Sequence, residues 1–411
     1  MRRRVVVTGM AGLCALGQDW KSVSEGLRAG RSGVTCIPEW DGIEGLATRL
    51  GCPIPDFTVP EYYPRKKTRG MGRVALLATR ATELALDDAG LLESPLLGGG
   101  RVGISYGSTN GSPPASDLYS QKLNVDRSIR GITSTVYIQF MSHTCAANLA
   151  QFFGTRGRIV PTCSACTAGS QGIGYGYEAV RYGLQDVMVT GGAEEFHLSG
   201  AAVFDIMHAA STRNDTPDTT PRPFDASRDG LVVGEGAATL VLEEREHART
   251  RGARIYAEVL GYGTNCDGRH LTTPDAEGME RVMRLALADA ELGPDAIDYL
   301  SAHATATEVG DIAESTAIEA VFGSRVPVSS LKGHLGHTLG ACGALEAWIT
   351  ISMARDGWVA PTLHLSEVDE RCGRLDYVRG APRALEVEIV VSNNFAFGGV
   401  NTSLVFGGLS E

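Results

Sequence analysis

Residues 158–170 read RIVPTCSACTAGS, and this stretch indicates an α/β fold with a reactive thiol. A short β-type run leads into a turn of small residues, and a helical pattern then continues to Tyr182. Strands that run into helices in this way are typical of α/β folds. Cys166 stands at the junction, where it faces unpaired N–H groups and the positive end of the helix dipole. Both favour the thiolate, so we expect Cys166 to act as a nucleophile near neutral pH.

The alternation of strands and helices recurs along the whole chain. Apolar runs predict strands near residues 5–8, 102–106, 159–162, 187–190 and 239–243, and again near 255–261, 299–302, 326–329, 389–392 and 402–406. Helical periodicity predicts helices near residues 74–89, 172–182, 279–290, 312–322 and 341–354. The two halves share this order of elements, so we expect an α/β protein with sheets covered on both faces and an internal duplication. The predicted halves are residues 1–250 and residues 251–411.

Composition and charge exclude several classes of protein. The chain has 411 residues, which is enough for two domains, and its hydrophobic content of 43% is that of an ordinary globular protein. No apolar run reaches the roughly 18 residues of a transmembrane helix, so we expect no membrane insertion. The net charge of −11 argues against nucleic acid as a partner. Nine scattered cysteines without disulfide-framework spacing predict a reducing, cytoplasmic location.

Cys163 gives Cys166 a Cys-x-x-Cys context that admits other interpretations. The pair could be a redox site, half of a zinc site, or two buried structural thiols. No second cysteine pair lies at the distance a zinc site requires. The small residues TAGS that follow Cys166 suit close approach of a substrate, which favours the nucleophile over the redox pair.

Two histidines follow strand-like runs in the second half of the predicted fold. His303 and His337 each enter a Gly- or Ala-rich turn, and the ends of strands are where α/β proteins gather catalytic groups. A neutral imidazole can donate a hydrogen bond through Nε2 to a developing oxyanion. The alternative for each histidine is a structural residue with satisfied hydrogen bonds. His334 is not included among the candidates.

Two further segments are candidates for substrate or partner contacts. Residues 393–401 read NNFAFGGVN and follow a strand, so their backbone N–H groups can approach a carbonyl oxygen, although an ordinary tight turn has the same pattern. Residues 65–73 read RKKTRGMGR, a basic run in an acidic protein. This run is either a solvated surface or a docking site for an acidic partner.

Seven motifs, taken together and in order, resemble those of the β-ketoacyl-acyl carrier protein synthases of type II fatty acid and polyketide pathways, members of the thiolase superfamily. They are SACT at 164–167, VTGGAE at 189–194, STRND at 211–215, RPFD at 222–225, HATAT at 303–307, GH at 336–337 and FAFGG at 395–399. The resemblance runs essentially from end to end. It implies a thiolase fold, in which two duplicated halves form a five-layered α-β-α-β-α core.

The resemblance also implies roles for individual residues. Cys166 would carry the acyl chain as a thioester, while His303 and His337 would support decarboxylation of a malonyl unit and stabilise its enolate. The other implied catalytic groups are Lys332 and Glu314 in a polar network, with the backbone N–H groups of Cys166 and Phe397 as an oxyanion hole. Phe397 would also act as a gate between the half-reactions.

Contacts with substrate, carrier protein and a cation are implied as well. Thr305 and Thr307 would bind the phosphopantetheine arm of the acyl carrier protein, and Phe395 would contact the substrate. Lys66 and Arg69 would dock that acidic carrier. No cofactor beyond the carrier's phosphopantetheine would be required, although a structural monovalent cation is expected near Glu314, Glu346, Ser392 and Asn393. The partner subunit would be an identical or a related ketosynthase-like chain.

Departures from the family pattern point to the substrate. Ala304 and Ala396 replace family glycines, and because Ala reaches positive φ less easily, they predict a stiffer gate loop.

Asn110 stands where related enzymes line the acyl pocket with an apolar residue. Together with the segments around residues 336–348 and 392–399, this resembles ketosynthases of aryl polyene clusters. Primary fatty acid elongation and a non-catalytic chain-length factor are the alternatives, but a chain-length factor lacks the active cysteine. A degradative thiolase would carry a second cysteine in the C-terminal loop.

Overall fold

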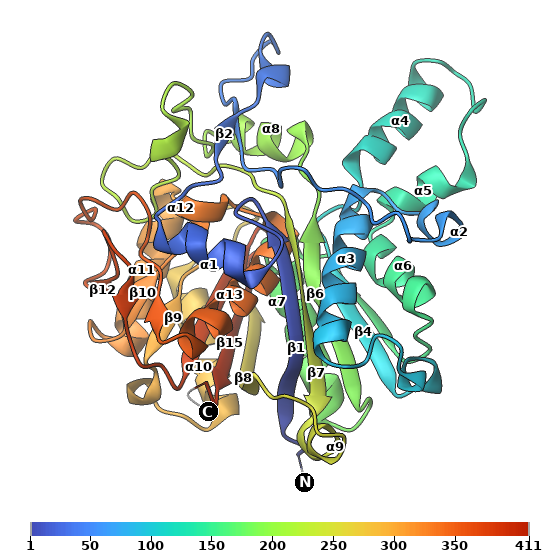
Figure 1. The fold of residues 1–411 in the computed structure, drawn as a ribbon. Helices are drawn as coiled ribbons and strands as arrows, with labels where there is room; N and C mark the ends of the chain where they lie inside the picture. The colour runs from blue at the N-terminus through green and yellow to red at the C-terminus, as the bar shows by residue number, and fades with distance from the viewer. Residues whose placement is uncertain (1, 410–411) are drawn as a thin grey trace.

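A computed structural model describes residues 2–409, whose centre is one mixed sheet of eleven strands (Figure 1). The strand order is β12-β10-β9-β14-β15-β8-β1-β7-β6-β4-β5. The strands of the first half are β1 (Val5–Cys14), β4 (Val102–Gly107), β5 (Ile159–Thr162), β6 (Val187–Glu194) and β7 (Gly236–Glu244). Those of the second are β8 (Ala257–Cys266), β9 (Tyr299–Ser301), β10 (Pro327–Ser329), β12 (Asp376–Tyr377), β14 (Val390–Ala396) and β15 (Val400–Gly407). Two small pairs lie apart: β2 (Thr35–Cys36) with β3 (Leu50–Gly51), and β11 (Trp358–Val359) with β13 (Arg383–Ala384).

The two halves of the sheet have the same topology. Read towards the centre of the sheet, the strand order is β5-β4-β6-β7-β1 in the first half and β10-β9-β14-β15-β8 in the second. When the five strands of each half are numbered along the chain, both orders read third, second, fourth, fifth, first. In each half the second strand is parallel to the third and fourth, and the last two pairings are antiparallel. The halves meet where Val5–Val7 pair with Ala257–Val259. The predicted α/β fold with duplicated halves is therefore confirmed.

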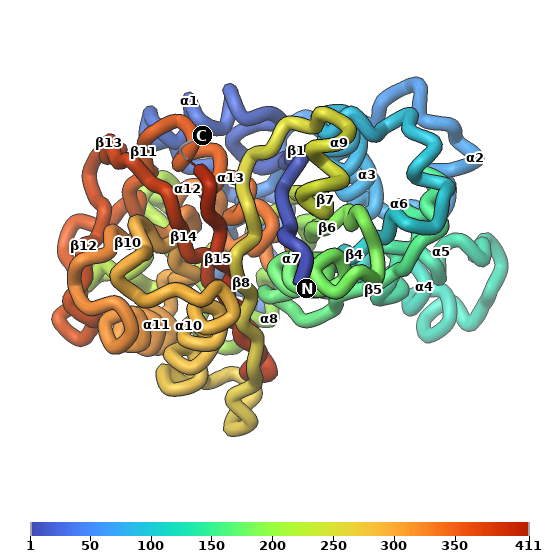
Figure 2. The backbone as a smooth tube through the Cα atoms, turned by 90° about the horizontal axis from the view of Figure 1, so that it is seen from below, coloured from blue at the N-terminus to red at the C-terminus, as the bar shows by residue number. Residues whose placement is uncertain are grey.

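Helices cover both outer faces and also fill the space between the two halves of the sheet. The outer helices are α3 (Arg73–Asp88) and α6 (Thr144–Phe153) on the first half, and α10 (Ala276–Ala290) and α11 (Glu308–Phe322) on the second. The central helices, α7 (Ala168–Arg181) and α13 (Cys342–Arg355), contact strands of both halves. Figure 2 shows the two outer pairs on opposite sides of the molecule. This arrangement gives the five layers of the predicted thiolase fold.

The remaining helices lie around this core. They are α1 (Trp20–Arg28), α2 (Arg65–Thr68), α4 (Pro113–Asn124), α5 (Ser134–Phe140), α8 (Leu198–Ile206), α9 (Arg245–Thr250) and α12 (Lys332–Leu335). Within residues 2–409, no helix has the length and apolar character needed to cross a bilayer. The cytoplasmic location stays a prediction.

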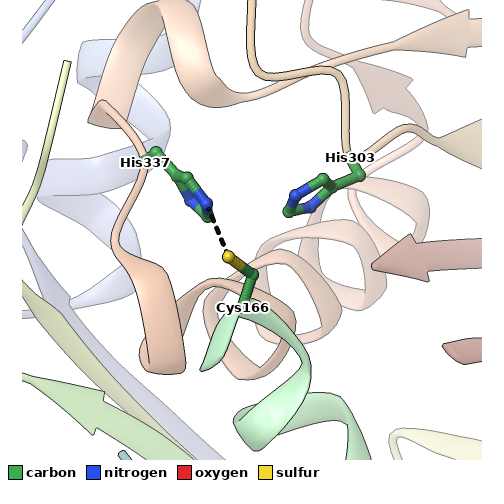
Figure 3. Close-up of side chains that lie close together, drawn as sticks. All are labelled: Cys166, His303 and His337. Atoms are coloured by element: carbon green, nitrogen blue, oxygen red, sulfur yellow. Dashed lines mark hydrogen bonds between the residues drawn. The ribbon is translucent and has the colours of Figure 1, made fainter. Parts of the chain in front are cut away.

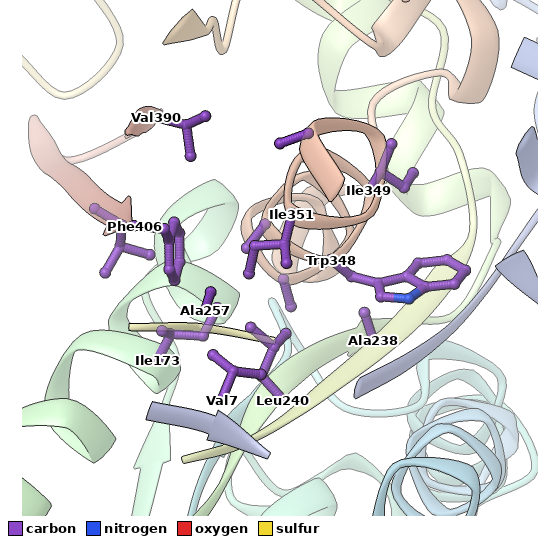
Figure 4. Packing of buried hydrophobic residues seen from close by; sticks show 14 of the residues in the cluster. Val7, Ile173, Ala238, Leu240, Ala257, Trp348, Ile349, Ile351, Val390 and Phe406 are labelled. Atoms are coloured by element: carbon purple, nitrogen blue, oxygen red, sulfur yellow. The ribbon is translucent and has the colours of Figure 1, made fainter. Parts of the chain in front are cut away.

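The central layer contains the largest apolar cluster, and it explains why the thiol and the imidazoles can meet. Residues 342–354 of α13 are all buried, as expected for a helix packed on every side (Figure 4). Trp348, Ile349 and Ile351 pack there with residues from β1, β7, β8, β14 and β15. A Cβ on Gly169 would lie 2.9 Å from the backbone nitrogen of Ala344, so the start of α7 approaches α13 closely only because residue 169 is glycine.

Most expected elements are present, with bounds shifted by a few residues, but eight of the thirteen α-helices in residues 2–409 were not predicted. Strand β1 extends from the expected residues 5–8 to Cys14, and α11 begins at Glu308 rather than near residue 312. Helices α4, α5 and α6 occupy residues 113–153, where no element was expected. Only Ala115 of α4 and Val136 of α5 are buried, so neither helix has the apolar stripe on which sequence prediction relies.

Candidate active site

Cys166 lies in a tight turn immediately before the central helix α7. The turn is the 3-10 segment η3 (Ala165–Thr167), and Ala165 has φ +50°, so the chain turns sharply between β5 and the helix. Cys166 thus precedes the first residue of α7, Ala168, by two positions, and it lies at the junction of strand and helix. The side chain is only 6% exposed, yet it lines a cavity of about 470 Å³.

The structure brings His303 and His337 to the same cavity wall as Cys166 (Figure 3). His303 follows β9, and His337 follows Gly336, whose φ of +63° turns the chain after α12. His337 Nε2 lies 3.1 Å from Cys166 Sγ, and the two imidazole centroids are 5.1 Å apart at an angle of 84°. Three residues that are far apart in the sequence thus form one cluster.

Hydrogen-bond partners determine which nitrogen of His303 carries its proton. Its Nδ1 lies 3.3 Å from Lys332 Nζ and 3.4 Å from Asn394 Nδ2, and both of these groups are donors. Nδ1 must therefore be the acceptor, which leaves the proton on Nε2. Burial, and then the charge of Lys332, lower the pKa of both His303 and His337 well below the usual 6.5. Both imidazoles are therefore neutral at pH 7.

The resting thiol of Cys166 is not the thiolate that the sequence predicted. Burial raises its pKa to about 12, while the charge of Lys332 and the residue's own backbone N–H lower it to a smaller extent. The prediction from the helix start is wrong because desolvation of an anion outweighs the favourable dipole. The nearest side-chain group able to accept the proton of this thiol is His337 Nε2.

Two buried carboxylates support the cluster, and their partners differ from those expected. Lys332 Nζ donates to Glu346 Oε1 at 2.6 Å, and Asn394 Nδ2 donates to Glu346 Oε2 at 2.6 Å. Glu314 instead accepts the backbone N–H groups of His303 and Ala304 at 2.8 and 2.6 Å. Burial raises the pKa of Glu314 to about 8. The direct partner of Lys332 is thus Glu346, and Glu314 holds the backbone of the His303 turn.

The cavity also contains the predicted substrate-contact residues of the second half. Thr305 and Thr307 line it with their hydroxyl oxygens 3.0 Å apart, and Phe395 and Phe397 line it as well. Phe204 was not predicted, although its ring lies 5.4 Å from that of Phe397. The apolar run of α8, in which Phe204 lies, was the only signal for it in the sequence.

The alanines that replace family glycines do not strain the backbone. Among the described residues with positive φ, neither Ala304 nor Ala396 is present. Gly398 and Gly399 do have positive φ, at +86° and +69°. The turn after β14 therefore depends on these two glycines, and alanine is tolerated at position 396 because it still belongs to the strand.

Three predicted contact residues lie outside the cavity. Lys66 and Arg69 are exposed at α2, as a docking site would require. Asn110 is also exposed and does not line the cavity of the chain. The role of Asn110 in the acyl pocket therefore stays a prediction, because within the single chain the residue is exposed on the loop after β4.

The predicted cation ligands are not gathered around a free carboxylate. Glu314 and Glu346 are both engaged as described above, whereas Ser392 Oγ and Asn393 Oδ1 are buried without a hydrogen-bond partner among residues 2–409. Oxygen atoms of this kind are the ligands that a hard cation prefers. The cation site stays a prediction. The ligand atoms of Cys166, His303 and His337 also lie within 4.8 Å of one another, but the ammonium of Lys332 opposes a cation there.

The alternative interpretations of neighbouring residues can also be judged. Cys163 is exposed and donates to the carbonyl of Ser142 at 2.8 Å, while Cys166 is buried, and all nine cysteines are free thiols. His334 is fully buried between the carbonyl oxygens of Arg31 and Pro361, away from the cavity. The decision to leave His334 out of the predicted site agrees with this position.

Comparison with known proteins agrees with the fold. The family model described as Beta-ketoacyl synthase, N-terminal domain, matches residues 2–248, and that described as Beta-ketoacyl synthase, C-terminal domain, matches residues 256–366. The chain is 36% identical over 406 residues to 3-oxoacyl-[acyl-carrier-protein] synthase 1 of Haemophilus influenzae, with 98% of each chain covered.

Solved structures are similar over nearly the whole chain. The crystal structure of a β-ketoacyl synthase from Burkholderia phymatum is 55% identical, with a TM-score of 0.97 and coverage of 98% of this chain and 99% of that one. The ishigamide ketosynthase/chain length factor is 34% identical, with a TM-score of 0.91 and 99% of each chain covered. The predicted resemblance is confirmed, and the chain belongs to the β-ketoacyl synthase family.

Proposed function

We propose that this chain is an acyltransferase that extends a carrier-bound acyl chain by decarboxylative condensation with a malonyl unit. The observation that carries the proposal is the convergence of one thiol and two neutral imidazoles at a single cavity. A thiol can hold an acyl group as a thioester, and two imidazole donors can stabilise an enolate oxygen. The similarity to a protein named 3-oxoacyl-[acyl-carrier-protein] synthase supports this reaction.

In the first half-reaction, Cys166 takes the acyl group from the carrier. Its Sγ attacks the thioester carbonyl, and the sulfur of the carrier's phosphopantetheine leaves. The thiol proton passes to His337 Nε2, which lies 3.1 Å away, and from there to the departing thiolate. The backbone N–H groups of Cys166 and Phe397 stabilise the tetrahedral oxyanion in this proposal. The high resting pKa of the thiol means that proton transfer accompanies attack instead of preceding it.

In the second half-reaction, a malonyl group on the carrier loses CO₂. The electrons of the broken C–C bond form an enolate, whose oxygen accepts a hydrogen bond from Nε2–H of His303. His337 can donate a second one through Nε2 once its remaining proton has moved from Nδ1 to Nε2 by exchange with water. The enolate carbon then attacks the acyl carbonyl, and Cys166 Sγ leaves as a thiolate, which takes up a proton from water to restore the thiol. Lys332 keeps His303 neutral and fixes its tautomer, Glu346 neutralises Lys332, and Glu314 holds the backbone of the turn.

The arm of the carrier enters through the same cavity in this proposal. Thr305 and Thr307 present their hydroxyl groups to the phosphopantetheine, and Phe395 and Phe397 border its path. The basic helix α2, with Lys66 and Arg69, attracts the acidic carrier. No cofactor beyond the phosphopantetheine takes part.

Two organisational features belong to the same proposal. Residues 1–250 and 251–411 form the two halves, which the matched strand order supports. The partner is an identical or a related ketosynthase-like subunit, and the similarity to a ketosynthase/chain length factor supports a pair of this kind.

The acyl chain is proposed to be an aryl polyene or a polyketide-type chain. Elongation of saturated chains in primary fatty acid synthesis is the second candidate, and the similarity to the Haemophilus influenzae enzyme favours it. A non-catalytic chain-length factor is disfavoured because Cys166, His303 and His337 are all present and close together.

Intact-protein mass spectrometry after incubation with acyl-carrier proteins tests the proposal. Acyl mass should appear on the wild type and on the Cys163→Ser control, but not on Cys166→Ala. His303→Ala should still load acyl groups, whereas His337→Ala should load them more slowly because the thiol loses its proton acceptor. Both variants should keep more of acyl transfer than of malonyl decarboxylation, which should fall about 100-fold or more. Loading retained in Cys166→Ala would contradict the proposed nucleophile, and wild-type decarboxylation in both histidine variants would contradict the proposed enolate donors. Preferential loading of aryl-polyenoyl over saturated chains would separate the two substrate classes.

A further inference from the structure

Glu194 is a buried carboxylate for which the proposed chemistry has no use. It ends strand β6, and its side chain is 2% exposed. One oxygen, Oε2, accepts two backbone hydrogen bonds, from the N–H of Thr109 at 3.0 Å and from the N–H of Gly340 at 2.9 Å. Thr109 belongs to the loop after β4, and Gly340 belongs to the 3-10 turn η6 (Leu339–Ala341), which follows His337.

Turn η6 is held between strand β6 and the turn that carries the nucleophile. A Cβ on Gly340 would lie 2.8 Å from Glu194 Oε2 and 2.7 Å from the nitrogen of Thr109, so the fit is close. On the opposite side, Cys342 Sγ donates to the carbonyl oxygen of Cys166 at 3.2 Å. The position of η6 relative to Cys166 is thus fixed from both sides.

Turn η6 lies next to the residue that makes the contact between imidazole and thiol. A single residue, Thr338, separates His337 from η6, so a shift of the turn moves the imidazole. His337 Nδ1 has no hydrogen-bond partner among residues 2–409, so the ring is not held in place from that side. The backbone of His337 is held by its own N–H, which donates to the carbonyl oxygen of Val232 at 2.7 Å, and by its carbonyl oxygen, which accepts the N–H of Gly234 at 2.9 Å. Glu194 adds the anchor for the turn that follows His337, on the side of the chain where the 3.1 Å contact of Nε2 with Cys166 Sγ is made.

We propose that Glu194 is a positioning residue for this reaction. Its carboxylate ties η6 and the loop after β4 to strand β6, and so holds His337 at hydrogen-bond distance from Cys166. The inference rests on the proposed role of Cys166 as the nucleophile.

The charge of Glu194 has a second effect that can be separated from its hydrogen bonds. The titratable groups that interact with it are Glu195, Cys145 and Cys166. Burial raises the pKa of Glu194 to about 7, and the charge of Glu195 adds to this, while the N–H donors lower it. A negative charge on Glu194 disfavours the thiolate of Cys166.

Two conservative substitutions separate hydrogen bonding from charge. Glu194→Gln keeps one carbonyl oxygen, which can accept both N–H groups, and removes the charge. Glu194→Asp keeps the charge but withdraws the acceptor by one methylene group. Glu195→Gln is the matched control, because Glu195 accepts the N–H of Val74 at 3.1 Å and does not anchor η6.

The readouts are malonyl decarboxylation and the pH dependence of Cys166 alkylation, measured on the whole protein by mass spectrometry. We expect Glu194→Gln to decarboxylate within about threefold of the wild type. Its alkylation curve should move to lower pH, so that Cys166 reacts about threefold faster at pH 8. Glu194→Asp should lose about tenfold in decarboxylation, without a shift of the alkylation curve to lower pH.

Wild-type decarboxylation in a folded Glu194→Asp variant would overturn the inference. A folded Glu194→Gln variant as impaired as Glu194→Asp would also overturn it, because the retained acceptor would then be irrelevant. Failure of the proposed function has a different signature, namely that Cys166 of the wild type neither reacts with an alkylating reagent nor takes up an acyl group.

Discussion

The ion pair of Lys332 with Glu346 provides a test of how the active site tolerates charge. The two side chains are 1% and 3% exposed, and Lys332 Nζ lies 2.6 Å from Glu346 Oε1. Replacing Lys332 with Met leaves the Glu346 carboxylate buried, with Asn394 Nδ2 as its remaining donor. Loss of one partner of a buried pair typically costs about 3–5 kcal/mol, because the other charge is left without compensation.

The double variant Lys332→Met/Glu346→Gln removes both charges and is the matched control. The amide oxygen of Gln can still accept the hydrogen bond from Asn394, so we expect the double variant to lie within about 1–2 kcal/mol of the wild type. The double-mutant cycle should therefore give a coupling energy of at least about 2 kcal/mol.

The pH dependence of this difference has a definite sign. Burial already raises the pKa of Glu346, and loss of the Lys332 charge raises it further. A carboxyl group whose folded-state pKa is raised favours the folded state most at low pH, and this contribution is lost as pH rises through the folded-state pKa. Lys332→Met should therefore fall furthest below the double variant at pH 8, and the gap should narrow towards pH 6.

Urea-induced unfolding at one fixed protein concentration measures these differences, since association with a partner subunit also contributes to stability. Malonyl decarboxylation should fall in both variants, because His303 Nδ1 loses the Lys332 donor in each. Equal unfolding midpoints for Lys332→Met and the double variant at pH 8 would refute the reasoning. They would mean that leaving Glu346 buried without Lys332 costs the folded state no stability.

Three further predictions concern reactivity, docking and the acyl chain. Because burial raises the pKa of Cys166 to about 12, its alkylation rate should rise about tenfold per pH unit from pH 7 to pH 10, and a plateau near pH 8 would contradict this. The double variant Lys66→Glu/Arg69→Glu should raise KM for carrier-bound substrate about tenfold in a salt-sensitive way and should leave activity on small thioesters unchanged. An equal loss of activity on both substrate types would mean that helix α2 has only a structural role. Asn110→Ile should shift competition between acyl-carrier classes about fivefold towards saturated chains, and unchanged loading ratios would remove Asn110 from substrate selection.

The sequence predicted the elements and residues whose signals are local. Each main strand is a short apolar run, and Cys166 and His303 follow such runs within a few residues, so their position after strand ends could be expected. The expectation that His337 also ends a strand is wrong, because helix α12 separates it from β10. The duplicated order of elements could be seen in the same way. These predictions needed no knowledge of which side chains face each other across the central layer.

What the sequence did not predict depends on burial and on pairing over long distances. Glu314 and Glu346 are both acids on helices near the site, and nothing in their spacing shows that Lys332 pairs with Glu346. The raised pKa of Cys166 follows from complete desolvation in the folded protein, which a local helix-start pattern does not reveal. The exposure of Asn110 likewise depends on how the loop after β4 lies on the surface.

Because the site is divided between the two halves, a chain that has folded only in part lacks some of the catalytic groups. The thiol of Cys166 comes from the turn between β5 and α7, whereas His303 and His337 come from the second half. A nascent chain in which only the first half has folded holds its thiol without either imidazole or the Lys332 ammonium. Such an intermediate has no means of drawing an acyl group from a carrier, because both proton transfer and charge stabilisation are missing. Reactivity thus requires both halves to be packed together on helices α7 and α13, so neither half alone carries the chemistry.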